Sequence, residues 1–318
     1  VLKNKINETL VISHAGILVP FFIGIVASYW IYEEYAAAQT AFLPFALFIG
    51  ISMSITAFQV LERIFQERHM TTPSLGTLAI DSAANVDVTA WCLLAVVIAI
   101  AKAGTFASAL YAIGLTALYI IIMFMVVRPF LKKVGEVYAN QEVINKTFVA
   151  LILLILIISS TLTEIIGIHA LFGAFMAGVV MPPSIGFRKV MMEKVEDIAL
   201  VFFLPLFFAF TGLRTEIGLI NSPALWGVCL LLITVAVAGK LGGCAVAARL
   251  VGESWKDSFT IGTLMNTRGL MELVALNIGY EMGVLPPSNF ILLVILAMVT
   301  TFLTTPLLPL AALIFLRR

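Results

Sequence analysis

Long apolar stretches dominate this chain and restrict it to one class of fold. Runs of about 20 apolar residues, enough to cross the hydrocarbon core of a bilayer as a helix, follow one another along almost its whole length. Hydrophobic residues make up 61% of the chain and charged residues only 12%, whereas soluble domains carry about 25% charged residues. The sequence therefore predicts an all-α polytopic membrane protein and disfavours a soluble enzyme.

The apolar stretches predict about ten transmembrane helices, most of them long enough for a full crossing. The sixth and seventh are short, and the region between residues 143 and 213 defines the number of crossings least clearly. The predicted helices cover residues 10–31, 41–61, 75–101, 106–127, 144–163, 167–182, 198–213, 223–248, 258–280 and 289–315.

Basic residues are distributed unevenly between the two sides of the membrane. Most of the 19 Lys and Arg residues fall in loops on the side of the N-terminus, whereas Lys102 and Arg214 fall on the opposite side. Cytoplasmic loops carry an excess of Lys and Arg, so both ends of the chain are predicted to be cytoplasmic. The net charge of +1 gives no basic field that would favour nucleic acid. The three cysteines lack metal-ligand spacing, and no cofactor or resident metal is expected.

One carboxylate, Asp87, falls inside the predicted helix 75–101. An ionisable side chain at mid-membrane costs about 2.5–3.5 kcal/mol on insertion scales, so a binding site for a cation or proton is the usual reason for its presence. The alternative is a carboxylate that pairs with a basic residue to fix helix packing. Asp81 and Asn85 share another face of this helix, being four residues apart, and Asp81 is close enough to the cytoplasmic end to be hydrated.

Further charged residues fall inside the predicted helices of the C-terminal part. Lys240 must lose its proton, find a carboxylate, or extend toward the membrane surface. Arg268 and Glu272 are four residues apart and can pair on one helix face. Such a pair could also be an internal salt bridge that stabilises the helix and takes no part in transport.

Two predicted helices contain polar interruptions that favour a break. In 258–280 the interruption is Asn266-Thr267-Arg268-Gly269, and in 41–61 it is the hydroxyl-rich segment that leads into Thr56, Ala57 and Phe58. The first three predicted helices and the last three form two groups that cross the membrane in opposite directions. In each group the interrupted helix is the middle one. Broken helices at matching positions of inverted halves indicate a transporter site at the midplane, which Asp87 and Lys240 would approach.

Several stretches resemble one family when taken together: ISMSITAFQVLERIFQERHM, TPSLGTLAIDSAANVDVTAWCLLA, HALFGAFMAGVVMP, FFLPLFFAFTGLRTEIG and GTLMNTRGLMELVALNIGYEMGVL. The chain resembles the second branch of the monovalent cation:proton antiporters, which includes Kef-type and other bacterial sodium/proton and potassium/proton exchangers and the plant cation/proton exchangers. The resemblance implies an elevator-type antiporter, in which two crossed, partly unwound helices carry the site.

The resemblance also implies roles for residues and segments. Asp87 would bind the cation and the proton, with Thr56 and Asn85 beside it, and Lys240 would pair with an acidic residue near the site. A moving core would consist of residues 1–101 and 221–318, joined through a linker helix and cytoplasmic loop (102–142) to a dimerising scaffold (143–220). A homodimer in the inner or plasma membrane is expected on the same ground.

The chain departs from the family pattern in three respects. Val86 stands where the family has Asp or Asn before the binding aspartate, so Lys240 would lose its counterion, with Asp81 and Glu62 as candidate substitutes. Gln59 replaces a proline that helps to hold the first broken helix open. The chain would also lack about three N-terminal helices of about 20 residues each.

These observations lead to one functional hypothesis with two alternatives. The hypothesis is exchange of Na⁺ or K⁺ for protons at Asp87, without enzyme activity, and with one-for-one stoichiometry because a single carboxylate is present. The first alternative is a channel-like or regulatory membrane protein of the same fold, and the second is a truncated remnant that does not transport.

Overall fold

The computed structural model describes residues 2–36, 39–67, 73–103, 105–138, 146–181 and 195–315. Throughout these ranges the regular structure is helical and no strand occurs. Within them, eight helical stretches are long and apolar enough to cross a membrane. They are Ile6–Tyr35, Phe42–Ile64, Leu75–Lys102, Ala107–Gly135, Val149–Ile166, Ala199–Leu219, Pro223–Leu250 and Pro287–Pro309.

The two other predicted crossings are not among these eight. The predicted helix 258–280 corresponds to two helices with an interruption between them, and 167–182 contains only the short apolar helix Ala170–Val179. The total of ten therefore remains a prediction. The predicted crossing 106–127 is part of a longer helix, which continues as an amphipathic segment through Arg128–Tyr138.

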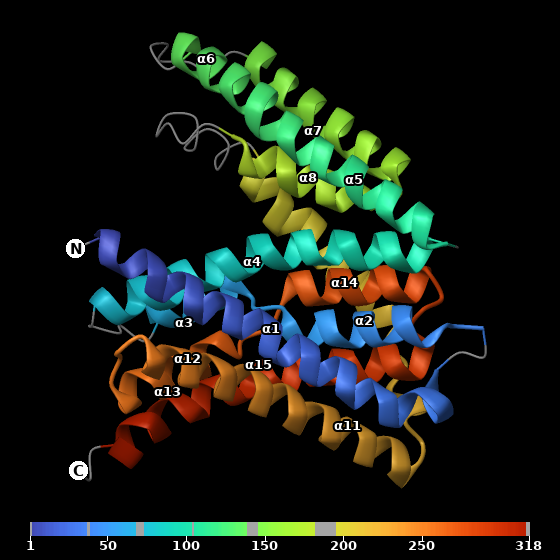
Figure 1. Cartoon of the computed structure of the whole chain (residues 1–318), viewed down its shortest axis with the longest axis vertical. Helices are drawn as coiled ribbons and strands as arrows, with labels where there is room; N and C mark the ends of the chain where they lie inside the picture. Colours follow the sequence, from blue (N-terminus) through green and yellow to red (C-terminus); the bar gives the residue numbers. More distant parts are fainter. Residues whose placement is uncertain are drawn as a thin grey trace. The chain divides into compact units, whose positions relative to one another are not determined.

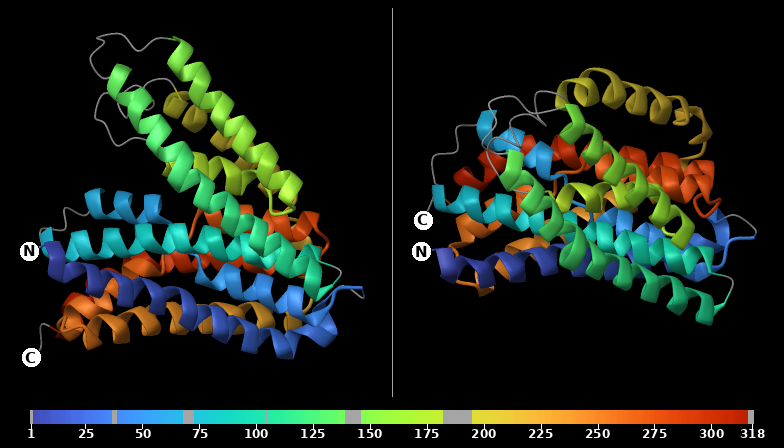
Figure 2. Two further views of the ribbon diagram at one scale, coloured as in Figure 1. Left: turned by 45° about the horizontal axis from the view of Figure 1, so that its top comes forward. Right: turned by 90° about the horizontal axis from the view of Figure 1, so that it is seen from above.

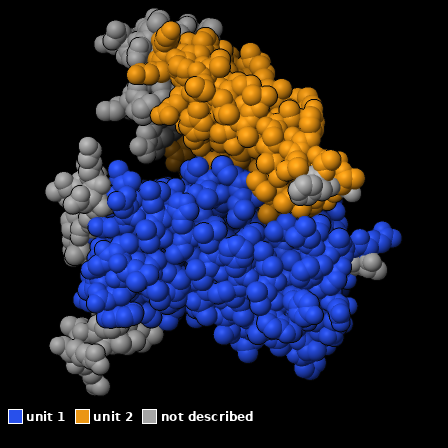
Figure 3. Space-filling model, in the orientation of Figure 1, with its two compact units in different colours: residues 1–94, 213–318 blue, residues 95–212 orange. Residues whose placement is uncertain are grey.

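Contacts between helices divide the chain into two compact units, residues 1–94 with 213–318 and residues 95–212 (Figure 3). The first unit contains most of α4 and all of the first and last helices of the chain. Its elements are α1 (Leu2–Tyr35), α2 (Phe42–Ser54), α3 (Phe58–Glu67), α4 (Pro73–Lys102), η4 (Ile217–Leu219), α11 (Pro223–Val237), η5 (Ala238–Gly242), α12 (Gly243–Leu250), α13 (Trp255–Met265), α14 (Leu270–Glu281) and α15 (Pro287–Phe315).

In the first unit, α1 packs against α2 and against the α11–α12 helix, while α13 and α14 lie against α15 (Figure 1). The contact between α1 and α2 depends on two glycines. A Cβ on Gly24 would lie 2.9 Å from the Gly50 Cα atom, so only glycine lets these two backbones approach so closely. The beginning of α1 and the end of α15 lie at the same end of the unit in all views (Figures 1 and 2).

The second unit contains α5 (Phe106–Ile122), η1 (Met123–Val127), α6 (Arg128–Tyr138), α7 (Lys146–Ile166), α8 (Ala170–Val179), η3 (Ala199–Phe203) and most of α10 (Leu204–Leu213). The segments α5, η1 and α6 form one continuous helix with a π-helical turn in its middle. Helix α8 packs tightly on α7 at Gly173, where an added Cβ would lie 2.4 Å from the Ser159 carbonyl oxygen.

Candidate functional site

Two interrupted helices meet inside the first unit. Helix α2 ends at Ser54 and α3 begins at Phe58, so Ile55, Thr56 and Ala57 are non-helical. Helix α13 ends at Met265 and α14 begins at Leu270, with Asn266–Gly269 between them. Four of the five residues assigned to unwound segments from the sequence therefore lie in the breaks, whereas Phe58 is the first residue of α3.

Hydrogen bonds join the two breaks directly. The Ala57 amide donates to the Thr267 carbonyl oxygen at 2.9 Å. The Thr56 hydroxyl donates to the Met265 carbonyl oxygen at 3.2 Å. Each break thus satisfies polar groups that the other exposes, which is the condition for non-helical backbone at membrane depth.

Two buried cations occupy the C-terminal end of α2. The last carbonyl groups of a helix lack partners within the helix and carry a partial negative charge. The Arg268 guanidinium donates to the carbonyl oxygens of Ser52 and, at 2.9 Å, of Met53, and the Lys240 ammonium donates to that of Ser54. Lys240 is fully buried and Arg268 is 2% exposed, so these contacts are shielded from solvent.

Lys240 adopts an arrangement that the sequence did not predict. Its ammonium also donates to the Gly16 carbonyl oxygen of α1 at 2.7 Å, and within the described ranges no carboxylate forms a salt bridge with it. Neither Asp81 nor Glu62 takes the place of the missing counterion. Backbone carbonyls from α1 and α2 compensate the charge instead. The side chain starts from η5, the π-helical turn between α11 and α12.

Arg268 also pairs with Glu272. Its guanidinium lies 3.1 Å from the Glu272 Oε1 atom, and both side chains have no solvent exposure. In the described part of the chain, Glu272 Oε2, Arg268 Nε and Asn266 Oδ1 are buried without a hydrogen-bond partner. Arg268 therefore links the end of α2 to the start of α14 across the two breaks.

The predicted residues of α4 have three different environments. Asp81 is exposed, and Asn85 donates from its side-chain amide to the Ser13 hydroxyl of α1 at 2.7 Å. Val86 is fully buried in a cluster that includes Met265, the residue before the second break. A Cβ on Gly16, whose carbonyl binds Lys240, would lie 4.0 Å from Val86 Cγ2. Val86 thus lies close to the backbone that holds Lys240.

Asp87 is partly buried and follows Val86 directly. It shares its face of α4 with Ala83 and Ala90, which are both fully buried. Among the described residues, none forms a hydrogen bond or ion pair with its carboxylate. Asp87 therefore directly follows a residue of the cluster at the crossing, and its carboxylate is not paired with any residue that the structure describes.

The sequence reasoning missed the contribution of α15. The Thr301 hydroxyl accepts a hydrogen bond from the Arg268 amide at 2.9 Å, and the Thr300 carbonyl oxygen accepts one from the Asn266 side chain at 3.4 Å. The paired threonines within an apolar helix were the available signal. The first break is present although Gln59 stands in place of a proline. Hydrogen bonds from Lys240 and Arg268 to the end of α2, and between Ala57 and Thr267, stabilise the non-helical segment instead.

Comparison with known proteins gives a match along almost the whole chain. The family model for the sodium/hydrogen exchanger transmembrane region matches residues 1–311. The chain is 39% identical over 307 residues to the Na(+)/H(+) antiporter NhaS4 of Synechocystis sp., which covers 96% of this chain and 75% of that protein.

Plant and yeast proteins match as well. Cation/H(+) antiporter 17 of Arabidopsis thaliana is 38% identical over 307 residues, and K(+)/H(+) antiporter 1 of Saccharomyces cerevisiae is 31% identical over 316 residues. Both alignments cover 96% of this chain, but only 37% of the plant protein and 36% of the yeast protein. The chain therefore spans little more than one third of these two relatives.

Proposed function

Because this chain belongs to the sodium/hydrogen exchanger family, we propose that it exchanges a monovalent cation, Na⁺ or K⁺, for protons across a membrane. The observation that carries the proposal is the crossing of two broken helices whose backbone ends are compensated by Lys240 and Arg268. The carboxylate of Asp87, which has no ion-pair partner among the described residues, directly follows Val86 of the cluster that packs there. Broken helices at membrane depth are a common way to build an ion site in a transporter.

The cations at the crossing limit where a transported ion can bind. Lys240 and Arg268 already hold the carbonyl oxygens of Ser52, Met53 and Ser54, which would otherwise attract a cation. We therefore assign the binding of the ion to Asp87, with oxygen atoms of Thr56 and Asn85 as further ligands. A proton and a metal ion compete for this one carboxylate, so Asp87 carries either a proton or a cation at each crossing, and never both together.

The stoichiometry follows from the same residues. Exchange at the carboxylate of Asp87 replaces one proton by one monovalent cation, while Arg268 and Glu272 stay paired with each other and Lys240 stays bound to backbone carbonyl oxygens. We propose electroneutral exchange on this basis. Alternating access would come from an elevator-type movement of the core against the scaffold, in a homodimer of the inner or plasma membrane with both ends of this chain cytoplasmic.

The test is proton flux in proteoliposomes that contain a pH-sensitive dye, with Na⁺ or K⁺ added outside. We expect a cation-driven pH change that Asp87→Asn abolishes and that Asp81→Asn leaves intact, since Asp81 is exposed on the same helix and provides a matched control. Equal flux in Asp87→Asn and the unmodified protein would overturn the assignment of Asp87. Cation flux without proton flux would favour a channel-like protein of this fold.

A further inference from the structure

An apolar groove runs along the second unit between the α5–η1–α6 helix and α7. Its volume is about 390 Å³, and its walls extend from Leu115 and Ile166 at one end to Phe130 and Leu151 at the other. Both views of Figure 2 show these two helices side by side over this length. Along α5 and α6 the groove covers about 22 Å, given a rise of 1.5 Å per residue.

The lining of the groove is suited to a hydrocarbon chain. Its polar side chains are Tyr119 and Ser159, which hydrogen-bond to one another at 2.5 Å, and Ser159 also donates to the Gly173 carbonyl oxygen at 2.6 Å. These groups are therefore satisfied and offer nothing to a polar ligand. The groove lies within two predicted membrane crossings, so the surrounding molecules are lipid acyl chains.

One end of the groove carries exposed positive charge. Arg128, Lys132 and Lys133 are all exposed on α6. The sequence of this helix contains one acidic residue, Glu136, so its basic residues outnumber its acidic ones. Lys133 is three residues beyond Phe130 and therefore continues the groove-lining face. The Arg128 guanidinium lies 5.8 Å from the centre of the Phe124 ring. Arg128 is about 32 Å along the helix from Ala107, which places it near the membrane surface.

We propose that this groove binds a phospholipid with an anionic headgroup. One acyl chain lies between α5 and α7, and the phosphate and anionic headgroup contact Lys132, Lys133 and Arg128. Basic pockets between transmembrane helices on the cytoplasmic side select anionic lipids in this way. A second helix is a less suitable occupant, because it would leave the cluster of cations unneutralised. The inference does not depend on the exchange activity proposed above.

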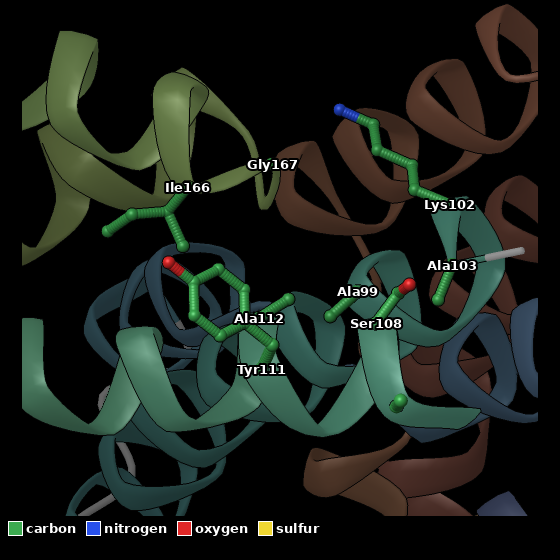
Figure 4. A pocket seen from close by; sticks show the side chains of 9 residues that line it. Ala99, Lys102, Ala103, Ser108, Tyr111, Ala112, Ile166 and Gly167 are labelled. Carbon is green, nitrogen blue, oxygen red and sulfur yellow. The ribbon is translucent and has the colours of Figure 1, made fainter. Parts of the chain in front are cut away.

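A second hollow of the same unit provides the control. It has a volume of about 430 Å³ and lies beyond Ile166, which lines both spaces, with Lys102 and Tyr111 on its two sides (Figure 4). Lys102→Gln removes one positive charge here, at the end of α4, whereas Lys132 and Lys133 lie in α6 beyond the far end of α5. A general effect of charge on lipid binding would appear in this variant too.

The experiment is native mass spectrometry of the purified protein titrated with phosphatidylglycerol or with phosphatidylcholine of the same acyl chains. We expect preferential binding of phosphatidylglycerol, weakened about 30-fold by Lys132→Gln/Lys133→Gln, at about 1 kcal/mol per removed charge. Phosphatidylcholine binding should be unchanged in that variant. Leu154→Trp, which fills the groove from a half-exposed position, should weaken both lipids, and Lys102→Gln neither.

Several results would overturn the proposal. Equal affinity for the two lipids, or phosphatidylglycerol binding that survives the double substitution, would remove the role of the cations. Lipid binding that Leu154→Trp leaves intact would place the lipid outside the groove. A change of oligomeric mass in Leu154→Trp without a change in lipid binding would show that another protein helix occupies the groove. Melting temperatures of all variants identify any that fail to fold.

Discussion

Replacing Arg268 is expected to destabilise the protein more than replacing Glu272, although the two side chains form one salt bridge. The reason is the number of partners. Glu272 has Arg268 as the partner of its Oε1 atom, and its Oε2 atom has none in the described structure. Arg268 additionally holds the carbonyl oxygens of Ser52 and Met53 at the end of α2. Removing Arg268 therefore leaves the carbonyl oxygens at the first break without their donor and also leaves Glu272 without its salt-bridge partner.

The contribution of the helix end can be isolated with two variants. In Glu272→Gln the buried charge is lost but Arg268 keeps both carbonyls. In Arg268→Met both carbonyls lose their donor. Each variant also leaves one buried charge without its salt-bridge partner, Arg268 in the first and Glu272 in the second, at about 3–5 kcal/mol, so this cost is common to both. The difference between the two is mainly the loss of hydrogen bonds to two buried carbonyls, at about 1–3 kcal/mol each, or about 2–6 kcal/mol in all.

The assay is thermal unfolding of the purified protein in detergent, followed by intrinsic tryptophan fluorescence. If 1 kcal/mol corresponds to about 2–4 °C, Arg268→Met should melt roughly 5–20 °C below Glu272→Gln. Melting temperatures within about 2 °C of each other would refute the reasoning. Arg268 would then serve only as the counterion of Glu272, and the end of α2 would need another explanation.

Two further predictions concern close packing. Gly173→Ala should lower stability by about 1–3 kcal/mol, because its Cβ would lie 2.4 Å from the Ser159 carbonyl oxygen, whereas Gly178→Ala, with open space around it, should have little effect; thermal unfolding of both distinguishes these outcomes. Val86→Asp should be tolerated in the unmodified background, because Lys240 is bound to the backbone beside it, but not together with Lys240→Met, which would leave an unpaired buried carboxylate. Equal melting temperatures of the single and double variants would contradict this.

Much of the architecture is accessible from the sequence because the membrane imposes simple rules. Apolar length identifies most of the crossings, and eight of the ten predicted stretches correspond to long apolar helices of the described structure. The segment that begins at Asn266 also carried a local signal, since polar residues followed by glycine are unfavourable in a helix interior. The positions at which helices end were harder to predict from the sequence. The helix that contains the predicted crossing 106–127 continues to Tyr138, because Arg128 and the lysines beyond it can extend to the membrane surface without ending the helix.

The environment of Lys240 could not be derived from the sequence, for a physical reason. Sequence reasoning compares side chains with side chains, so a buried ammonium prompts a search for a carboxylate. Here the compensating oxygens belong to the backbone of Gly16 and Ser54, and they are available only because α2 stops where it does. No residue type identifies such an acceptor in advance. The end of α2 and the burial of Lys240 depend on each other, since the helix end needs a cation and the cation needs free carbonyls. Val86 is compatible with this arrangement because Lys240 is bound by backbone oxygens and does not require an acidic side chain at position 86.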